Sequence, residues 1–204
     1  MNKRVAIIAP LGAHGSAHHF YLFGQLHGLK KHKVDVRIYT NSKTKDPEID
    51  GVNFYQFFGA LFSSRFRFIK GIKYLIGIMK SVFHARFSGV KLFHFHIFYV
   101  NILVVFSFLL IRLLFGKIVV TIHDVNSFEK DRDAYSFIRW TYKLVDIILT
   151  HNNFSREEII NIAPSLKDRI QIIPHGNYTP FINILKDKKR SRDYLDLPSD
   201  KTIL

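Results

Sequence analysis

The apolar residues of the chain fall into short runs separated by longer amphipathic segments. Runs rich in apolar and β-branched residues predict strands at Arg4–Ala9, Val34–Tyr39, Val52–Phe57, Val90–Phe95, Ile118–Ile122, Asp146–Thr150 and Arg169–Ile173. Helical spacing of apolar residues predicts helices in most of the intervening segments. Because strands that alternate with helices are typical of the α/β class, we expect a Rossmann-like parallel sheet flanked by helices.

The segment Ile97–Phe115 is the most apolar of the predicted helices. Its uncharged part, Ile97–Ile111, is shorter than the ~20 residues that a membrane-spanning helix needs, and Arg112 interrupts the segment. We therefore expect a buried or membrane-leaning helix, with a membrane span as the alternative. The apolar run at the amino terminus is too short for a signal peptide and is better explained as the first strand.

Composition indicates a folded domain without disulfide bonds. The chain has 204 residues, of which 48% are apolar, and it has no cysteine. That length suits one large domain, or one domain and the start of another. The lack of cysteine excludes disulfides and thiolate metal sites, and it fits a reducing compartment.

The net charge of +14 is unevenly distributed along the chain. Residues 51–123 contain nine Lys or Arg residues and no Asp or Glu. Within them, the predicted helix at Ser63–Phe87 combines apolar residues at helical spacing with basic ones. Such a helix is typical of contact with an anionic membrane surface, and an ordinary packing helix with a solvated basic side is the alternative. The residues that we expect to contact the membrane are Arg65, Arg67, Lys70 and Lys73.

Polar residues follow the predicted strands abruptly. The strand Ile118–Ile122 ends at His123 and Asp124, and the preceding strand ends in the pattern HxH, with His96 expected just past its end. In open α/β sheets, ligands bind beyond the carboxyl ends of the strands, so His123 and Asp124 are our candidates for the chemistry. The alternative is that the two residues cap the next helix or pair with each other.

A glycine-containing loop follows the first strand. Gly12 and Gly15 permit a tight turn before a helix that runs to about Lys30, an arrangement that favours an anion site. A simple turn is the alternative, because GxxG is neither a dinucleotide-binding fingerprint nor a P-loop. His14 lies in this loop, close in sequence to two further histidines. Without a nearby carboxylate or thiolate, we expect hydrogen bonds to phosphate or sugar and no metal.

The carboxyl-terminal part contains two further signals. Ser155 is a candidate cap for the helix that contains Glu157 and Glu158. From Lys186 the composition becomes strongly charged, with a proline near the end. We therefore expect residues 1–185 to form one Rossmann-like domain, and residues 186–204 to form a linker and the start of a truncated second domain.

The motifs APLGAHGSAHHF, FHFH, VVTIHD, THNNFSREEI and IIPHGN occur in this order along the chain. The ordered set resembles the N-terminal, acceptor-side half of GT-B fold glycosyltransferases, most closely the retaining enzymes of family 4. These enzymes build bacterial polysaccharides and glycolipids. The resemblance covers essentially the whole chain, although the family usually has adjacent glycines where this chain has Gly12 and Gly15.

The resemblance implies a role for each motif. His123 would lie near the transferred sugar, with Asp124 beside it as the second candidate catalytic residue. His96 would line the acceptor side. The residues that would contact the donor phosphates or the substrate are, besides His96, Gly12, Gly15, His14, His175 and Gly176.

The resemblance further implies a retaining hexosyltransferase that moves a sugar from a nucleotide-sugar donor to a lipid-linked or saccharide acceptor. It would act peripherally at the cytoplasmic face of the plasma membrane, and we expect no cofactor and no metal. Most of the donor site would belong to the second domain, so these residues alone are expected to be inactive. The alternative is a non-enzymatic module that binds anionic lipid or nucleic acid through residues 65–117. No helix-turn-helix, RNP or zinc pattern supports nucleic acid.

Overall fold

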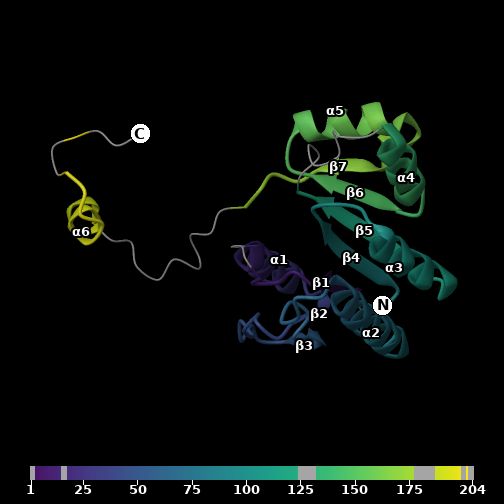
Figure 1. The fold of residues 1–204 in the computed structure, drawn as a ribbon, viewed down its shortest axis with the longest axis horizontal. Coiled ribbons are helices and arrows are strands. Elements are labelled where there is room, and N and C mark those ends of the chain that lie inside the picture. The colour runs from purple at the N-terminus through teal and green to yellow at the C-terminus, as the bar shows by residue number, and fades with distance from the viewer. Residues whose placement is uncertain (1–2, 15–17, 124–131, 177–186, 199–200, 202–204) are drawn as a thin grey trace.

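The structure is a computed structural model that describes residues 3–14, 18–123, 132–176, 187–198 and 201. Seven parallel strands form one sheet in the order β3-β2-β1-β4-β5-β6-β7, which confirms the predicted α/β fold (Figure 1). The strands are β1 Arg4–Ala9, β2 Asp35–Asn41, β3 Val52–Gly59, β4 Leu92–Ile97, β5 Lys117–Ile122, β6 Ile147–Thr150 and β7 Ile170–Ile172. The chain reverses direction along the sheet between β1 and β4, which is where a doubly wound sheet forms its ligand crevice.

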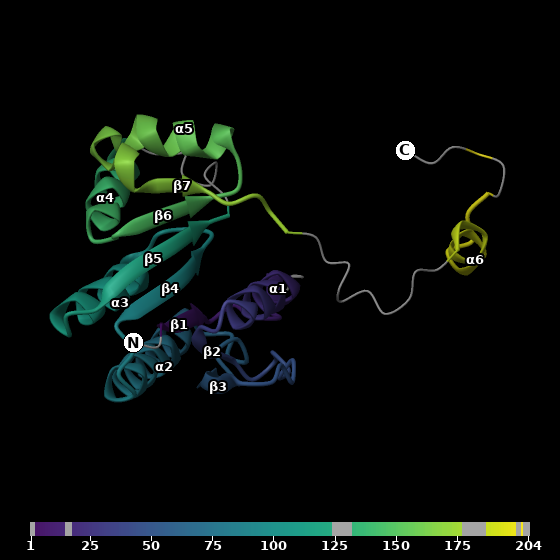
Figure 2. The same ribbon diagram turned by 180° about the vertical axis from the view of Figure 1, so that it is seen from behind.

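Helices cover the sheet unequally on its two faces. Helix α1 (His18–Lys31) packs on β1 and β2 through Leu22, Phe23 and Leu26. The larger apolar core lies on the other face, beneath α2 (Arg67–Phe87), α3 (Ile102–Leu113), α4 (Arg132–Lys143) and α5 (Asn153–Ile162). Figure 2 shows the same layers from behind. A short 3₁₀ helix, η2 (Pro164–Arg169), precedes β7, and α6 (Lys188–Tyr194) lies in the charged segment that begins at Lys186.

Two predicted element boundaries are wrong. Strand β4 continues to Ile97, so His96 lies within the strand and shares a face with His94, not beyond the strand's end. Helix α5 is capped by Asn152, whose side chain accepts a hydrogen bond from the Ser155 backbone N–H at 2.8 Å. Ser155 therefore lies inside the first turn and is not the cap.

Helix α3 is shorter than the apolar segment that contains it. It has 12 residues, and Asn101 caps its amino end by accepting hydrogen bonds from the N–H groups of Leu103 and Val104. Among the described residues, no helix combines the length and the apolar character needed to cross a bilayer. The predicted domain boundary after residue 185 falls within residues 177–186, which lie outside the described residues, so this boundary stays a prediction.

Candidate functional site

The side of β4 and β5 that faces α1 is polar near the carboxyl ends of these strands. In β4, alternate residues Phe93, Phe95 and Ile97 enter the large core, which leaves His94 and His96 on the opposite face. Thr121 lies beside His96 in the strand register. The backbone N–H of His123, just after β5, donates to the Ile97 carbonyl at 3.1 Å and so fixes the backbone of His123 beside the end of β4.

Four histidines and one glutamine form a continuous series of hydrogen bonds on this face, which we call the histidine chain. Gln25 of α1 bridges the two β4 histidines, because its amide Nε2 lies 3.0 Å from His94 Nδ1 and its Oε1 lies 2.9 Å from His96 Nε2. His96 Nδ1 lies 3.0 Å from His123 Nε2, and His123 Nδ1 lies 3.3 Å from His151 Nε2. The ends of the chain are Thr121 Oγ1, 2.8 Å from His94 Nε2, and the Ile173 carbonyl, 3.0 Å from His151 Nδ1.

Aromatic rings enclose His123 on several sides. Phe98 stacks on its ring with centroids 4.8 Å apart, and His18 and Tyr21 of α1 contact it edge-on at 4.9 and 5.0 Å. Tyr21 also lies 4.9 Å from the ring of His175, which follows β7. The ends of β4, β5, β6 and β7 therefore meet the first turn of α1 at a single site.

Burial keeps these imidazoles neutral near pH 7. It lowers the pKa of His94 to about 4, and burial together with the neighbouring histidines lowers the pKa of His123 to about 3. The pKa of His96 also falls well below its usual value, mainly because the ring is buried. Neutral imidazoles both donate and accept hydrogen bonds, so each ring can be linked to a neighbour on either side.

Three of the histidines, His18, His96 and His123, have ring nitrogens within 4.8 Å of one another, a grouping that could hold a metal ion. However, both ring nitrogens of His96 and both of His123 already take part in the histidine chain. A cation bound here would have to displace those hydrogen bonds. Hydrogen bonding is therefore the chemistry that this arrangement supports.

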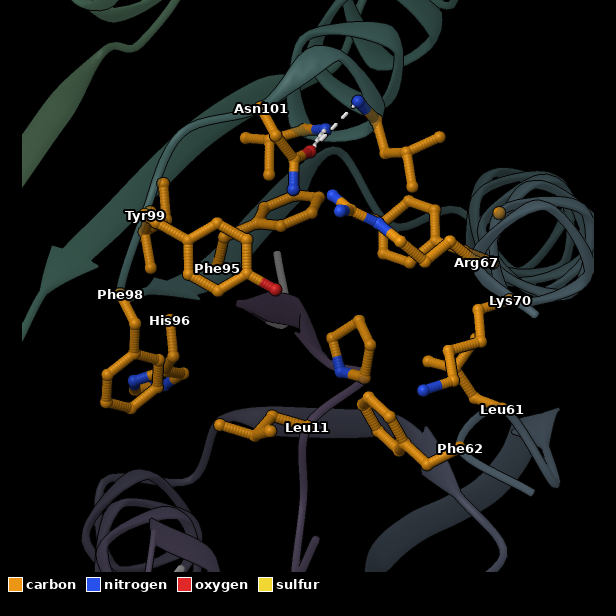
Figure 3. Close-up of a pocket in the computed structure, with 16 residues that line it drawn as sticks. Leu11, Leu61, Phe62, Arg67, Lys70, Phe95, His96, Phe98, Tyr99 and Asn101 are labelled. Carbon is orange, nitrogen blue, oxygen red and sulfur yellow. Dashed lines mark hydrogen bonds between the residues drawn. The ribbon is translucent and has the colours of Figure 1, made fainter. Parts of the chain in front are cut away.

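A pocket of about 300 Å³ opens next to the histidine chain, and His96 lines it (Figure 3). Leu11, Leu61 and Phe62 form part of its apolar wall, and the first turns of α2 and α3 form its rim. Figure 3 shows the Lys70 amine and the Tyr99 hydroxyl pointing into the cavity. The pocket thus combines an apolar wall with a basic rim and ends at the histidine chain.

Some predicted site residues lie near this site without belonging to the histidine chain. Gly12 has a φ of +46°, and a Cβ there would lie 1.9 Å from Thr44 Oγ1, so the turn after β1 requires glycine. His14 stacks on Phe62 with centroids 3.9 Å apart, at the wall of the pocket. His175 lies beside His151, with ring centroids 4.9 Å apart. Gly176 follows His175 and has open space where a Cβ would be.

Gly15 and Asp124 lie outside the described residues, so their predicted roles stay predictions. Of the predicted membrane-contacting residues, Arg67 and Lys70 line the pocket, and Arg65 is exposed. Lys73 Nζ instead donates hydrogen bonds to Ala60 O and Ser63 Oγ, at 3.1 and 3.0 Å.

Sequence reasoning missed three members of the site. Tyr21 lies three residues after His18, and Gln25 lies four residues after Tyr21, which places all three on one side of α1. That helical spacing was the available signal, although nothing in it predicts a bridge to β4. His151 is the first residue after β6. Because polar residues also follow the other strands at this edge of the sheet, the same reasoning could have predicted His151 as a site residue.

The comparison with protein families decides the assignment. A family model described as Glycosyltransferase Family 4 matches residues 19–177, a range that includes the pocket's α2 and α3 and the whole histidine chain. The chain belongs to glycosyltransferase family 4. Comparison with curated proteins gave no match.

Solved structures share the fold of this family 4 domain at low sequence identity. A sucrose-phosphate synthase from Thermosynechococcus elongatus has a TM-score of 0.66 at 13% identity, over 98% of this chain and 54% of its own. A UDP-N-acetylglucosamine 2-epimerase from Rickettsia bellii has a TM-score of 0.61 at 11% identity, over 97% and 52%. An E. coli structure titled as trehalose-6-phosphate bound with UDP-2-fluoro glucose has a TM-score of 0.58 at 11% identity, over 95% and 54%. This chain therefore spans about half the length of these structures, and it has the fold of an N-terminal GT-B domain.

Proposed function

We propose that the protein transfers a hexose, with retention of configuration, from a nucleotide-sugar to a lipid-linked or saccharide acceptor in bacterial polysaccharide or glycolipid synthesis. One observation carries the proposal. His96 lines the pocket and is also hydrogen-bonded to His123, with 3.0 Å between His96 Nδ1 and His123 Nε2. The histidine expected at the transferred sugar and the cavity expected to hold the acceptor are thus one hydrogen bond apart.

The donor side of this proposal rests on neutral imidazoles. Glycosyl transfer releases an anionic nucleotide diphosphate and develops positive charge on the sugar ring, so a cationic histidine at the sugar would be unfavourable. His123 stays neutral because burial lowers its pKa to about 3. Support for a nucleotide-sugar donor comes from family membership and from two relatives of the same fold, whose titles name a UDP-sugar.

The acceptor side rests on the composition of the pocket. Its apolar wall suits a hydrocarbon chain or the apolar face of a sugar, and Arg67 and Lys70 at its rim suit a phosphate group. Asp and Glu are absent from residues 51–123, so no carboxylate of that stretch competes for these two cations. A phosphate-bearing lipid acceptor matches both properties.

Contact with a membrane is supported by the outer sides of α2 and α3. These helices pack on each other, with the Tyr74 hydroxyl 3.0 Å from Ser107 Oγ, yet both leave large apolar residues exposed. Phe68 is 78% exposed and Leu113 is 74% exposed. We call this surface the α2–α3 apolar face, and its main residues are Phe68, Ile72, Phe87, Ile102, Leu109 and Leu113. An apolar face flanked by basic residues favours peripheral binding to the anionic cytoplasmic leaflet.

The proposal is tested by measuring nucleotide release by the full-length protein from a panel of sugar nucleotides, with and without membrane lipid extract. We expect release from one donor that rises at least tenfold with extract, together with a glycosylated lipid that retains the donor's anomeric configuration. Release from no donor under either condition, from a folded protein, would contradict the proposal. The non-enzymatic binding module would then be the better account.

A further inference from the structure

Three rings of the histidine chain, His96, His123 and His151, lie between Gln25 and the Ile173 carbonyl, and these two groups set how many protons the three rings need. At one end, the Ile173 carbonyl accepts from His151 Nδ1, so that nitrogen carries a proton. At the other end, Gln25 Oε1 faces His96 Nε2, which must also carry a proton in order to donate to an amide oxygen. The two bonds between these ends, His96 to His123 and His123 to His151, need one proton each.

The number of protons shows that the orientation of the Gln25 amide depends on the charge of the histidine chain. The two end bonds and two internal bonds need four N–H protons in total, whereas three neutral imidazoles supply three. When Gln25 Oε1 faces His96 Nε2, the three rings therefore hold one extra proton. If the amide is turned by 180°, Gln25 Nε2 donates to His96 and Gln25 Oε1 accepts from His94 Nδ1–H. Thr121 then donates to His94 Nε2, and every ring is neutral with all its bonds intact.

The surroundings favour the neutral arrangement near pH 7. The titratable groups that face these rings are His18 and Tyr21 from α1 and His175 after β7. Neighbouring histidines oppose a positive charge, and no carboxylate of the described residues forms an ion pair with His94, His96, His123 or His151. Uptake of one proton from solvent on His96 Nε2 removes its acceptor lone pair, so the amide must then present its oxygen to His96 and its N–H to His94 Nδ1. His94 stays neutral because its proton changes from Nδ1 to Nε2, which then donates to Thr121 Oγ1.

We propose that Gln25 is a positioning residue that fixes which nitrogen of His96, and through it of His123, carries the proton. The Gln25 amide rotates by 180° when the histidine chain takes up one proton. In the neutral arrangement, His96 Nδ1–H donates to His123 Nε2, and His123 Nδ1–H donates to His151. The consequence for sugar transfer rests on the proposed function, whereas the effect on the rings does not.

The test is the ¹⁵N spectrum of the histidine rings in the full-length protein, which distinguishes protonated from unprotonated nitrogens. In the unsubstituted protein at pH 7.5, we expect a single Nδ1–H tautomer at both His96 and His123. Gln25→Met keeps the volume and removes both hydrogen bonds, so His96 should populate a mixture of tautomers. Gln25→Glu places a carboxylate between His94 and His96, so His96 should become doubly protonated at the same pH. Gln171→Glu adds the same charge on exposed β7 and should change neither ring.

Two results would overturn the inference. One is a His96 that stays neutral with an unchanged tautomer in both Gln25 variants, when backbone amide shifts show that the variants are folded. The other is the same change in Gln171→Glu as in Gln25→Glu. The transfer assay then separates the two proposals, because Gln25→Met should lower kcat about tenfold or more and leave the acceptor KM within about twofold. Changed ring spectra in a protein without any transferase activity would refute the proposed function and leave the Gln25 assignment standing.

Discussion

At the scale of single residues, the site depends on histidines that are buried and fully hydrogen-bonded. His94 is only 6% exposed, and its two ring nitrogens hydrogen-bond with Gln25 and Thr121. A buried polar ring is tolerated when each nitrogen has a partner, whereas its charged form would lose the solvation that water provides. The burial that lowers the pKa of these rings therefore makes the fold sensitive to acid.

We predict that the free energy of unfolding falls as the pH is lowered from about 6.5 towards 4. The unfolded chain binds protons at its histidines below pH 6.5, whereas folded His94 resists protonation until its pKa of about 4. Each such histidine contributes a slope of about 1.4 kcal/mol per pH unit. Urea denaturation of the protein between pH 7.5 and 4.5 measures this slope. The substitution His94→Gln should reduce the slope by about 1.4 kcal/mol per pH unit, which is the contribution of one histidine. An equal slope in both proteins would contradict the prediction.

A polar residue that interrupts an apolar run was the signal by which the sequence indicated the position of the site. His123 was recognised because it ends such a run at the carboxyl edge of a parallel sheet, and edge polarity is visible in the sequence. Gln25 was not recognised, because its function arises only when α1 packs across β4, 69 residues later in the chain. Contacts of that kind depend on tertiary structure and leave no local pattern.

At the scale of helices and strands, one glycine controls how closely α2 approaches the sheet. Gly77 is buried in the middle of α2, where a Cβ would lie 2.6 Å from the Phe58 ring and 3.1 Å from the Phe58 Cα. Gly71 lies in the same helix with no atom within 4 Å of its Cβ position. Glycine is an unfavourable residue inside a helix at either position, yet only Gly77 has a packing reason.

We predict opposite effects for alanine at these two positions. Gly77→Ala should lower the free energy of unfolding by roughly 1–3 kcal/mol, because buried Phe58 must shift to admit the methyl group. Gly71→Ala should raise it by up to about 1 kcal/mol, because alanine is the better helix former at an unhindered position. Urea denaturation of both variants provides the measurement. Destabilisation by Gly71→Ala as large as that by Gly77→Ala would show that close packing at Gly77 is not the cause.

The order and type of the described strands and helices could be predicted, because apolar runs and helical spacing report burial directly. The ends of elements were harder to predict. His96 was expected beyond β4 because a polar residue usually ends a buried strand, yet this one faces a polar site and the strand continues. Asn152 and Ser155 are both good capping residues, and only the backbone conformation decides between them.

At the scale of the whole molecule, the pocket, the basic residues and the α2–α3 apolar face lie close together. The first turns of α2 and α3 form the rim of the pocket, and the same helices carry the exposed apolar side chains. In Figure 1, α2 and α3 lie in front of the sheet. A membrane bound at this face would place the phosphate of a lipid acceptor near Arg67 and Lys70.

We predict that binding to vesicles with about one-third phosphatidylserine weakens roughly a thousandfold when Arg65, Arg67, Lys70 and Lys73 are all replaced by Gln, because each cation contributes ~1 kcal/mol. Phe68→Ser with Phe87→Ser should weaken binding to the same vesicles by removing inserted apolar area. The matched control replaces four exposed lysines elsewhere, Lys31, Lys45, Lys143 and Lys167, by Gln. If this control loses as much affinity as the variant with four Gln substitutions at residues 65–73, binding depends on net charge and not on basic residues beside the α2–α3 apolar face.

The central claim is that sugar transfer takes place at the histidine chain, and the most direct measurement is the rate of transfer by His123→Ala in the full-length protein. We expect a loss of about a hundredfold or more, because the variant removes the ring that links the pocket to the strand ends. His32→Ala, at an exposed histidine after α1, should keep the rate of the unsubstituted protein. Full transfer by a folded His123→Ala variant would contradict the account.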